Sequence, residues 1–260
     1  MTTVNTNIAS LRAQESLSVN GRFLQKTLDH LSTGKRITSA DDDAAGIAIV
    51  SSMTAQVKSL NQQIRNANDG ISLLQTADGS TAQVIQMLQR MRELVTQALN
   101  GTYSDDDIAN MGSEVDAIKT EMNRIATDTK WNNVALLDGN FTDVSLQVSD
   151  SAANVITINI DDLQTSAMDG IDDIDFSNPA DVTTDWLDSI DTAITTVSSA
   201  RSNIGATINR LNYTVDNLTS AVVNVSASKS RIEDLDYSQA TSDLSRAQII
   251  QQAATAMLAQ

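Results

Sequence analysis

Three groups of residues near the N-terminus could do chemistry. The step Gly34-Lys35-Arg36 could hold a phosphate, the aspartates at 41–43 could hold a metal ion, and His30, the only histidine, could act as a base. Each of these activities needs further residues at fixed spacing. The neighbouring sequence therefore decides between a chemical role and a structural one.

The neighbouring sequence favours a structural role for the first two groups. A phosphate loop needs a glycine five positions before its last glycine and Ser or Thr after the lysine, where this chain has Asp29 and Arg36. We expect a helix to end at Gly34 instead, with basic residues beside its negative end. The aspartates lack the alternating spacing of a calcium loop, so we expect Ser39 or Asp41 to cap the helix that follows.

Catalysis finds little support elsewhere in the chain. A single histidine and the absence of cysteine exclude two-histidine and thiolate metal sites, and no G-x-S-x-G sequence marks a serine nucleophile. The sequence therefore predicts that the protein is not an enzyme, with no catalytic residue, no metal site and no cofactor.

The composition favours helices packed on helices. Of 260 residues, 41% are hydrophobic, only 3% are aromatic and one is proline, so aliphatic side chains on long helices must form the core. A net charge of −16 argues against binding to nucleic acid or to an anionic membrane. No apolar run approaches the ~18 residues of a membrane span. The first residues lack the pattern of a cleaved signal peptide, so secretion would use another route.

Apolar residues spaced alternately three and four apart predict three long helices. The first runs from about 46 to 99 and would be on the order of 80 Å long. The second follows Ser104 as N-cap, and the third covers 187–225. Asp78 interrupts the first apolar stripe and Arg201 the last. Such sustained heptads predict a mainly α fold, a long antiparallel coiled-coil bundle.

The connection before the last long helix contains the expected strands. Apolar residues alternate with polar ones at Val144, Leu146 and Val148, and again from Ile156 to Ile160, which predicts one β-hairpin near 140–160. Residues 161–185 hold eight aspartates and few apolar anchors. We expect this acidic segment to be an exposed loop.

Both ends of the chain are predicted to be helical, with apolar stripes that no neighbouring element covers. Isolated helices are marginal in water, and burying one Leu or Ile contributes roughly 1.5–3 kcal/mol. The stripes must therefore pack against each other or against copies of themselves. The residues expected at this polymer interface are Val4, Ile8, Leu11, Leu24, Leu28, Leu31, Leu244, Ile250, Ala254, Met257 and Leu258.

Long segments in both halves of the chain resemble bacterial flagellin. They include LSTGKRITSADDDAAGIAI, RNANDGISLLQTADG and LQRMRELVTQALNGTYS in the first half and SRIEDLDYSQATSDLSRAQIIQQAATAMLAQ at the end. The resemblance covers about 1–140 and 186–260, and these motifs occur in the family's order.

The resemblance implies a division into two domains. A terminal coiled coil, D0, would comprise 1–45 and 234–260, with a joint to the next domain at 33–45. The D1 helical bundle would comprise 46–233. Only the acidic segment 161–185 lies where outer domains are often inserted, so the resemblance implies a minimal flagellin with little or no D2 or D3.

The resemblance also implies a function. Flagellins polymerise into the extracellular helical filament of the bacterial flagellum, which drives swimming. They are exported unfolded by the flagellar type III apparatus. The implied partners are further copies of the chain, an export chaperone, the filament cap protein and the hook-junction proteins. The alternative is the hook–filament junction protein, which has related terminal helices.

One segment resembles a surface that host Toll-like receptor 5 recognises in many flagellins. Arg90 and Leu94 match positions of that motif, and Glu114 matches a further contact. A solvated face that only contacts neighbouring copies is the alternative. The residues expected on this surface are Gln89, Arg90, Arg92, Glu93, Leu94 and Glu114.

The chain departs from the family in two places. It has Trp131-Asn132-Asn133 where members often have Phe-Asn-Gly, and we expect asparagine to tolerate the positive φ of such a turn. Flagellins usually continue beyond a MLAQ sequence, whereas this sequence stops at Gln260, so we expect either that the sequence is cut short here or that the D0 helix is shorter.

Overall fold

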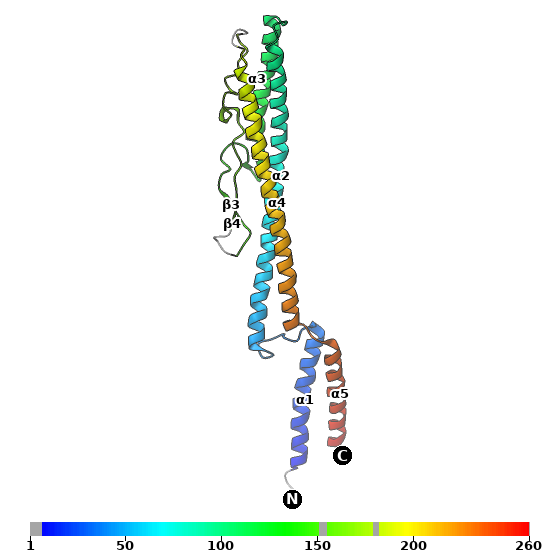
Figure 1. The fold of residues 1–260 in the computed structure, drawn as a ribbon. Coiled ribbons are helices and arrows are strands. Elements are labelled where there is room, and N and C mark those ends of the chain that lie inside the picture. Colours follow the sequence, from blue (N-terminus) through cyan, green and yellow to red (C-terminus); the bar gives the residue numbers. More distant parts are fainter. Residues whose placement is uncertain (1–6, 151–154, 179–181, 260) are drawn as a thin grey trace. The chain divides into compact units, whose positions relative to one another are not determined.

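The computed structural model of the chain describes residues 7–150, 155–178 and 182–259, without the side chains of the last two. Most of these residues are helical, so the mainly α fold is confirmed. The helices and strands, shown in Figure 1, are α1 (Ile8–Thr33), α2 (Ala44–Ala98), α3 (Asp105–Asp128), β1 (Lys130–Trp131), β2 (Val134–Ala135), β3 (Val144–Gln147), β4 (Val155–Ile158), the 3-10 helix η1 (Thr165–Ala167), α4 (Asp185–Glu233) and α5 (Tyr237–Ala259).

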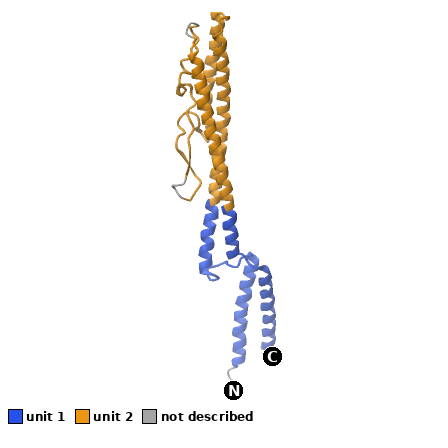
Figure 2. Cartoon of the chain, viewed as in Figure 1, with its two compact units in different colours: residues 1–59, 221–260 blue, residues 60–220 orange. Residues whose placement is uncertain are grey.

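The chain forms two compact units (Figure 2). One comprises 60–220, and the other comprises 1–59 with 221–260. Helices α2 and α4 contribute to both units, so these limits differ from the expected D0 and D1 domains. The D0 and D1 boundaries stay a prediction.

The core of unit 60–220 is built from the apolar faces of α2, α3 and α4, which lie side by side in Figure 1. Most of its buried residues occupy the heptad positions predicted from the sequence, but Val84 is buried where the prediction placed Ile85. Its fully buried side chains include Leu74, Val84, Leu88 and Met91 from α2, Val115 and Met122 from α3, and Ile190, Val197 and Leu211 from α4.

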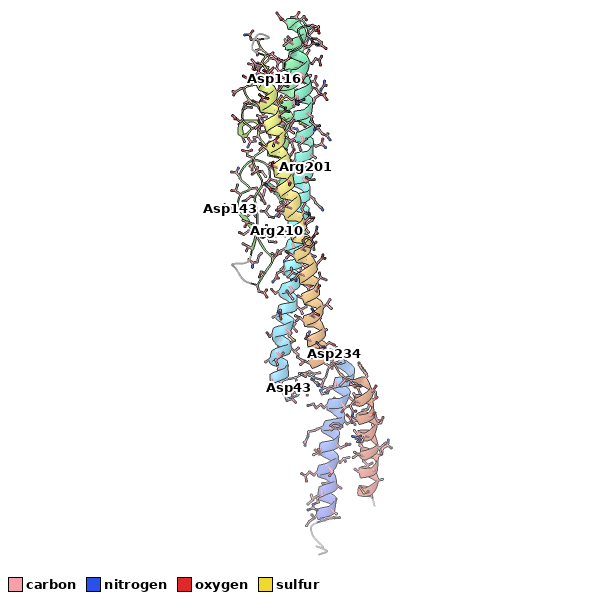
Figure 3. All side chains as sticks on the ribbon, in the orientation of Figure 1. Asp43, Asp116, Asp143, Arg201, Arg210 and Asp234 are labelled. Atoms are coloured by element: carbon pink, nitrogen blue, oxygen red, sulfur yellow. The ribbon has the colours of Figure 1, made fainter. Side chains whose placement is uncertain are left out.

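The two residues that interrupt the heptads contact each other. Arg201 of α4, labelled in Figure 3, donates from Nε to Asp78 Oδ1 of α2 at 2.8 Å and from Nη2 to Oδ2 at 3.3 Å. The carboxylate holds the pKa of Arg201 above its ordinary value. Since a two-pronged pair fits only one alignment of the two helices, it fixes their register.

Hydrogen bonds between Ser104 and Asp107 determine where α3 begins. Ser104 accepts a hydrogen bond from the N–H of Asp107, and the Asp107 carboxylate accepts one from the N–H of Ser104. This capping box satisfies two amides of the first turn. The predicted N-cap is therefore confirmed.

The short hairpin of β1 and β2 turns through Asn132 and Asn133, which have φ values of 47° and 65°. A two-residue turn with positive φ at both positions matches the twist of its flanking strands, and asparagine is among the residues that adopt it. The expected tolerance of asparagine in this turn is confirmed.

The one hairpin that the sequence predicted, near 140–160, is present, whereas the β1–β2 hairpin was not predicted. β3 pairs antiparallel with β4, with Leu146 opposite Ile156 and Val144 opposite Ile158. Val148, Ile156 and Ile158 are buried as the alternation predicted, but Val144 is exposed. Residues 151–154 of the connecting loop lie outside the described residues.

The expectation that 161–185 is an exposed loop is wrong for its described apolar residues. Leu163, Met168, Ile171, Ile174 and Phe176 are all buried, while most of the aspartates face solvent. The buried residues recur about every third position in irregular chain, a pattern that matches neither a strand nor an α-helix.

Contacts with α3 and α4 hold this segment in place. Lys119 Nζ donates to the carbonyls of Asp172 and Ile174, and Asn123 exchanges hydrogen bonds with Thr165 at 2.9 Å. Phe176 lies 5.2 Å from Trp186 between ring centroids. These partners are distant in sequence, so local composition could not indicate them.

Candidate functional site

Helices α1 and α5 lie side by side within unit 1–59 and 221–260 (Figure 1). Small residues fill the seam between them. Ala240, Ala247 and Ala254, one heptad apart on α5, are buried, and Thr27 is buried on α1. Asn20 Nδ2 of α1 donates to the carbonyl of Ala247 at 2.9 Å. Small side chains allow the two backbones to approach closely, so each helix covers one face of the other.

A second apolar face on each helix remains exposed. On α1 it includes Ile8, Leu11, Val19 and Phe23, with exposed fractions between 46% and 56%. On α5 it includes Ile249, Ile250 and Met257, with exposed fractions of 66%, 45% and 70%. We call these seven residues the outward stripes. Large apolar side chains grouped this way mark an interaction surface rather than ordinary surface scatter.

The structure divides the predicted interface residues between these two faces. Leu24, Leu31 and Leu244 are half-buried and Ala254 is buried, so they belong to the seam. Ile8, Leu11, Leu28, Ile250 and Met257 are exposed. Val4 lies outside the described residues, and so does the side chain of Leu258. The prediction had left open whether the ends pack on each other or on copies; the intramolecular contact uses only part of the apolar surface.

Sequence reasoning missed Val19, Phe23 and Ile249. A signal was present for the first two, because positions 8, 11, 19 and 23 fall on one face of a helix with 3.6 residues per turn. Ile249 does not belong to an apolar stripe of this kind in the sequence. It is next to Ile250 in the chain, and it lies on the side of α5 that faces away from the buried alanines.

The joint between α1 and α2 contains the residues that first suggested chemistry. Helix α1 ends at Thr33, and Gly34 adopts a φ of 70°, the left-handed conformation of a helix C-cap. This confirms the predicted helix end. Lys35 bonds to Glu233 at 2.6 Å, and the N–H of Arg36 donates to the carbonyl of Glu233 at 2.7 Å. The basic residues therefore tie the joint to the end of α4.

The cap of α2 differs from the expectation. Asp43, labelled in Figure 3, accepts from the N–H groups of Ala45 and Gly46 at 3.0 and 2.9 Å. It therefore caps α2, and the prediction of Ser39 or Asp41 is wrong. Those two residues bond to each other one turn earlier, where Ser39 Oγ donates to Asp41 Oδ1.

Asp42 connects α1 to the residues of the joint. Lys26 Nζ of α1 lies 2.6 Å from its Oδ1, while its Oδ2 accepts from the N–H and hydroxyl of Thr38 at 2.9 Å and from the N–H of Ser39 at 3.1 Å. Lys26 first, and then these amide and hydroxyl donors, hold the pKa of the Asp42 carboxyl far below its ordinary value despite burial. Lys35 and then Lys229 likewise lower the pKa of Glu233.

Nothing in this geometry resembles a catalytic or metal site. Within the described ranges, no group of three His, Asp or Glu side chains could hold a metal ion. In the same part of the chain, no helix has the length and apolar content to span a membrane. The aspartates at 41–43 are engaged in capping and in ion pairs.

Ion pairs between helices lie on the surface that resembles the receptor-recognition motif. Arg90 Nε of α2 donates to Glu114 of α3 at 2.8 Å, and Arg92 Nε donates to Asp191 of α4 at 2.6 Å. Glu114 raises the pKa of Arg90, and Asp191 raises that of Arg92. An open groove of about 630 Å³ lies alongside, lined in part by Gln89, Arg92 and Glu93.

Leu94 does not belong to this surface. Its side chain is only 2% exposed and packs in the core, so the expectation that it joins a receptor surface is wrong for this conformation. The other five predicted residues, Gln89, Arg90, Arg92, Glu93 and Glu114, are exposed.

Comparisons with known proteins agree with this geometry. The family model described as the bacterial flagellin N-terminal helical region matches residues 4–142, and the one described as the C-terminal helical region matches 187–260. The flagellin of Halalkalibacterium halodurans is 38% identical over 99% of this chain and 94% of its own length.

Two solved structures share the fold. The crystal structure of Bacillus cereus flagellin has a TM-score of 0.53 and 30% identity, covering 64% of this chain and 94% of that one. A putative flagellar hook-associated protein from Vibrio parahaemolyticus has a TM-score of 0.65 over 74% of this chain and all of that one. At 16% identity, the second shows similarity of fold alone.

Proposed function

Because the chain belongs to the bacterial flagellin family and is a structural subunit of the flagellar filament, we propose that it polymerises through the outward stripes of α1 and α5. The observation that carries this proposal is that the seam leaves exposed the seven large apolar side chains of the outward stripes, and Leu28 as well. About half of each side chain is already covered, so burying the rest with neighbouring copies would gain roughly 0.7–1.5 kcal/mol for each Leu or Ile. Part of the apolar surface of the end helices would therefore become buried only on assembly.

Seeded growth tests the proposal. Leu11→Asp and Ile250→Asp place a charge in the outward stripes, while Gln14→Asp and Gln252→Asp place the same charge at exposed polar positions on the same helices. We expect the stripe variants to elongate on filament seeds about tenfold more slowly or worse, because each loses roughly 0.7–1.5 kcal/mol of burial and also places an unpaired charge in the interface. The polar-position variants should grow nearly as wild type. Equal growth of all four would exclude the outward stripes as the interface.

We also propose for this chain the export route, the export chaperone and the cap and hook-junction partners that are typical of flagellins. Export unfolded through the type III apparatus is supported by the absence of cysteine and by end helices that bury little surface in the single chain. An export chaperone binding the C-terminal segment would cover the outward stripe of α5 meanwhile. The cap and hook-junction proteins would meet the two ends of the polymer. A junction protein, the alternative, would bind seeds without propagating, so the same growth assay distinguishes the two.

We further propose that host Toll-like receptor 5 recognises the exposed face formed by Gln89, Arg90, Arg92, Glu93 and Glu114. The support is that α2 and α3 present these side chains together, ordered by the pair of Arg90 with Glu114. Arg90→Ala monomer should stimulate a receptor reporter less than wild type. Arg65→Ala, which removes an exposed arginine elsewhere on α2, should not reduce the response. Equal responses to all three proteins would remove this proposal.

A further inference from the structure

His30 is anomalous within the joint. Its Nε2 is buried yet makes no hydrogen bond to any described residue, although it lies only 3.3 Å from Asp42 Oδ2. The side chain is 15% exposed. A neutral imidazole carries one donor and one acceptor nitrogen. An uncharged ring can offer the carboxylate only a neutral N–H, and only in its Nε2–H tautomer, and a buried polar atom without a well-made hydrogen bond is unfavourable.

Protonation would turn this contact into an ion pair. In the imidazolium both nitrogens are donors, and the partner is a carboxylate that stays ionised because Lys26 and the Thr38 donors hold its pKa low. His30 also lies in the last turn of α1, where the partial negative charge of the helix end favours a cation.

Other charged groups lie around the ring. From α1 they are Arg22, Lys26 and Asp29; from the joint, Arg36, Asp41 and Asp42; and from α5 and the residue before it, Asp243 and Asp236. Carboxylates outnumber cations in this set. Imidazole side chains change charge between about pH 5 and 8, whereas ordinary Asp, Lys and Arg side chains do not.

We propose that His30 is a proton-operated latch of the joint. When its imidazole is protonated, it forms an ion pair with Asp42 that holds the last turn of α1 against residues 38–43; when it is neutral, Lys26 remains as the charged partner of Asp42 from α1. The stiffness of the link between α1 and α2 then varies with external pH. This inference concerns contacts within one chain and holds whether or not the outward stripes form the polymer interface.

Amide hydrogen exchange of the full chain tests the latch. We compare protection factors, which correct for the intrinsic pH dependence of exchange, for residues 27–43 at about pH 5.5 and about pH 8. Wild type should be roughly fivefold more protected at the lower pH, as expected for one charged hydrogen bond at a partly exposed site. Equal protection at both pH values would overturn the proposal.

Two variants isolate the ring charge. His30→Gln cannot be protonated and should lose the pH difference, whereas His30→Lys carries a permanent charge and should be protected at both pH values. Amides of α3 serve as the internal reference for folding. If His30→Gln keeps the wild-type pH difference while α3 remains protected, another group is responsible and the latch is excluded.

Discussion

At the scale of single residues, polar side chains within apolar stripes give the helices their alignment. Asp78 and Arg201 each break a heptad pattern, and they form a two-pronged ion pair across α2 and α4. The buried Thr81 donates its hydroxyl to the carbonyl of Ala77 at 2.7 Å, so it needs no partner on another helix. Heptads alone allow neighbouring registers, and the ion pair selects one of them.

Gly112 shows how closely the acidic segment packs on α3. A Cβ at this position would lie 2.4 Å from Cβ of Phe176, so Gly112→Ala must displace backbone or ring. We expect it to lower the free energy of unfolding by about 1–3 kcal/mol. Urea titration measures the change.

Gly79→Ala is the matched control, because it also replaces a glycine inside a helix but meets nothing within 4 Å. It should raise the free energy of unfolding by about 0.5–1 kcal/mol, since alanine is the better helix former. If both variants shift stability in the same direction by the same amount, the close packing of 161–178 on α3 is refuted.

At the scale of elements, periodic segments could be predicted from sequence and irregular ones could not. The heptads placed α2 at 46–99, and it spans Ala44–Ala98. Residues 161–178 were misjudged because their buried side chains are held by Lys119, Asn123 and Trp186, which belong to other elements.

The candidate site could be predicted only in outline. The end helices were correctly expected to carry apolar stripes, but their two faces were merged into one list. The inward face is recognised by its small residues, such as Ala247 and Ala254, whose burial depends on where the partner helix lies. Leu94 was misplaced for a related reason, because a motif position does not say which side of α2 faces the core.

The joint should loosen in acid. The pKa values of Asp42 and Glu233 are lowered in the folded chain by Lys26 and Lys35. Such carboxylates stabilise the fold above their unfolded pKa values of about 3.9 and 4.3, and this stabilisation is lost as pH falls through the folded values. Amide protection of residues 35–43 should therefore decline as pH drops below about 4.

Asp42→Asn should make this acid decline shallower, whereas Asp169→Asn, which alters an exposed aspartate in the other unit, should leave it unchanged. An unchanged acid slope in Asp42→Asn would show that this carboxylate does not hold the joint. Together with protonation of His30, the account predicts greatest protection of the joint near pH 5.

At the scale of the whole molecule, the two compact units differ in how well they cover their own apolar surface. Unit 60–220 buries large side chains from α2, α3, α4 and the acidic segment. In the other unit, the buried positions of α1 and α5 are mostly small, and the large apolar residues remain outside. The first unit covers its large apolar side chains, whereas the second leaves exposed those that the proposed polymer interface would use.

The most direct test compares the outward stripes before and after assembly. The chain has no cysteine, so Leu11→Cys and Ile250→Cys each introduce a single thiol. Both thiols should react readily in the monomer and at least about 100-fold more slowly in seeded filaments, as expected when access requires an opening of about 3 kcal/mol. Equal labelling rates in monomer and filament would contradict the claim that neighbouring copies cover these stripes.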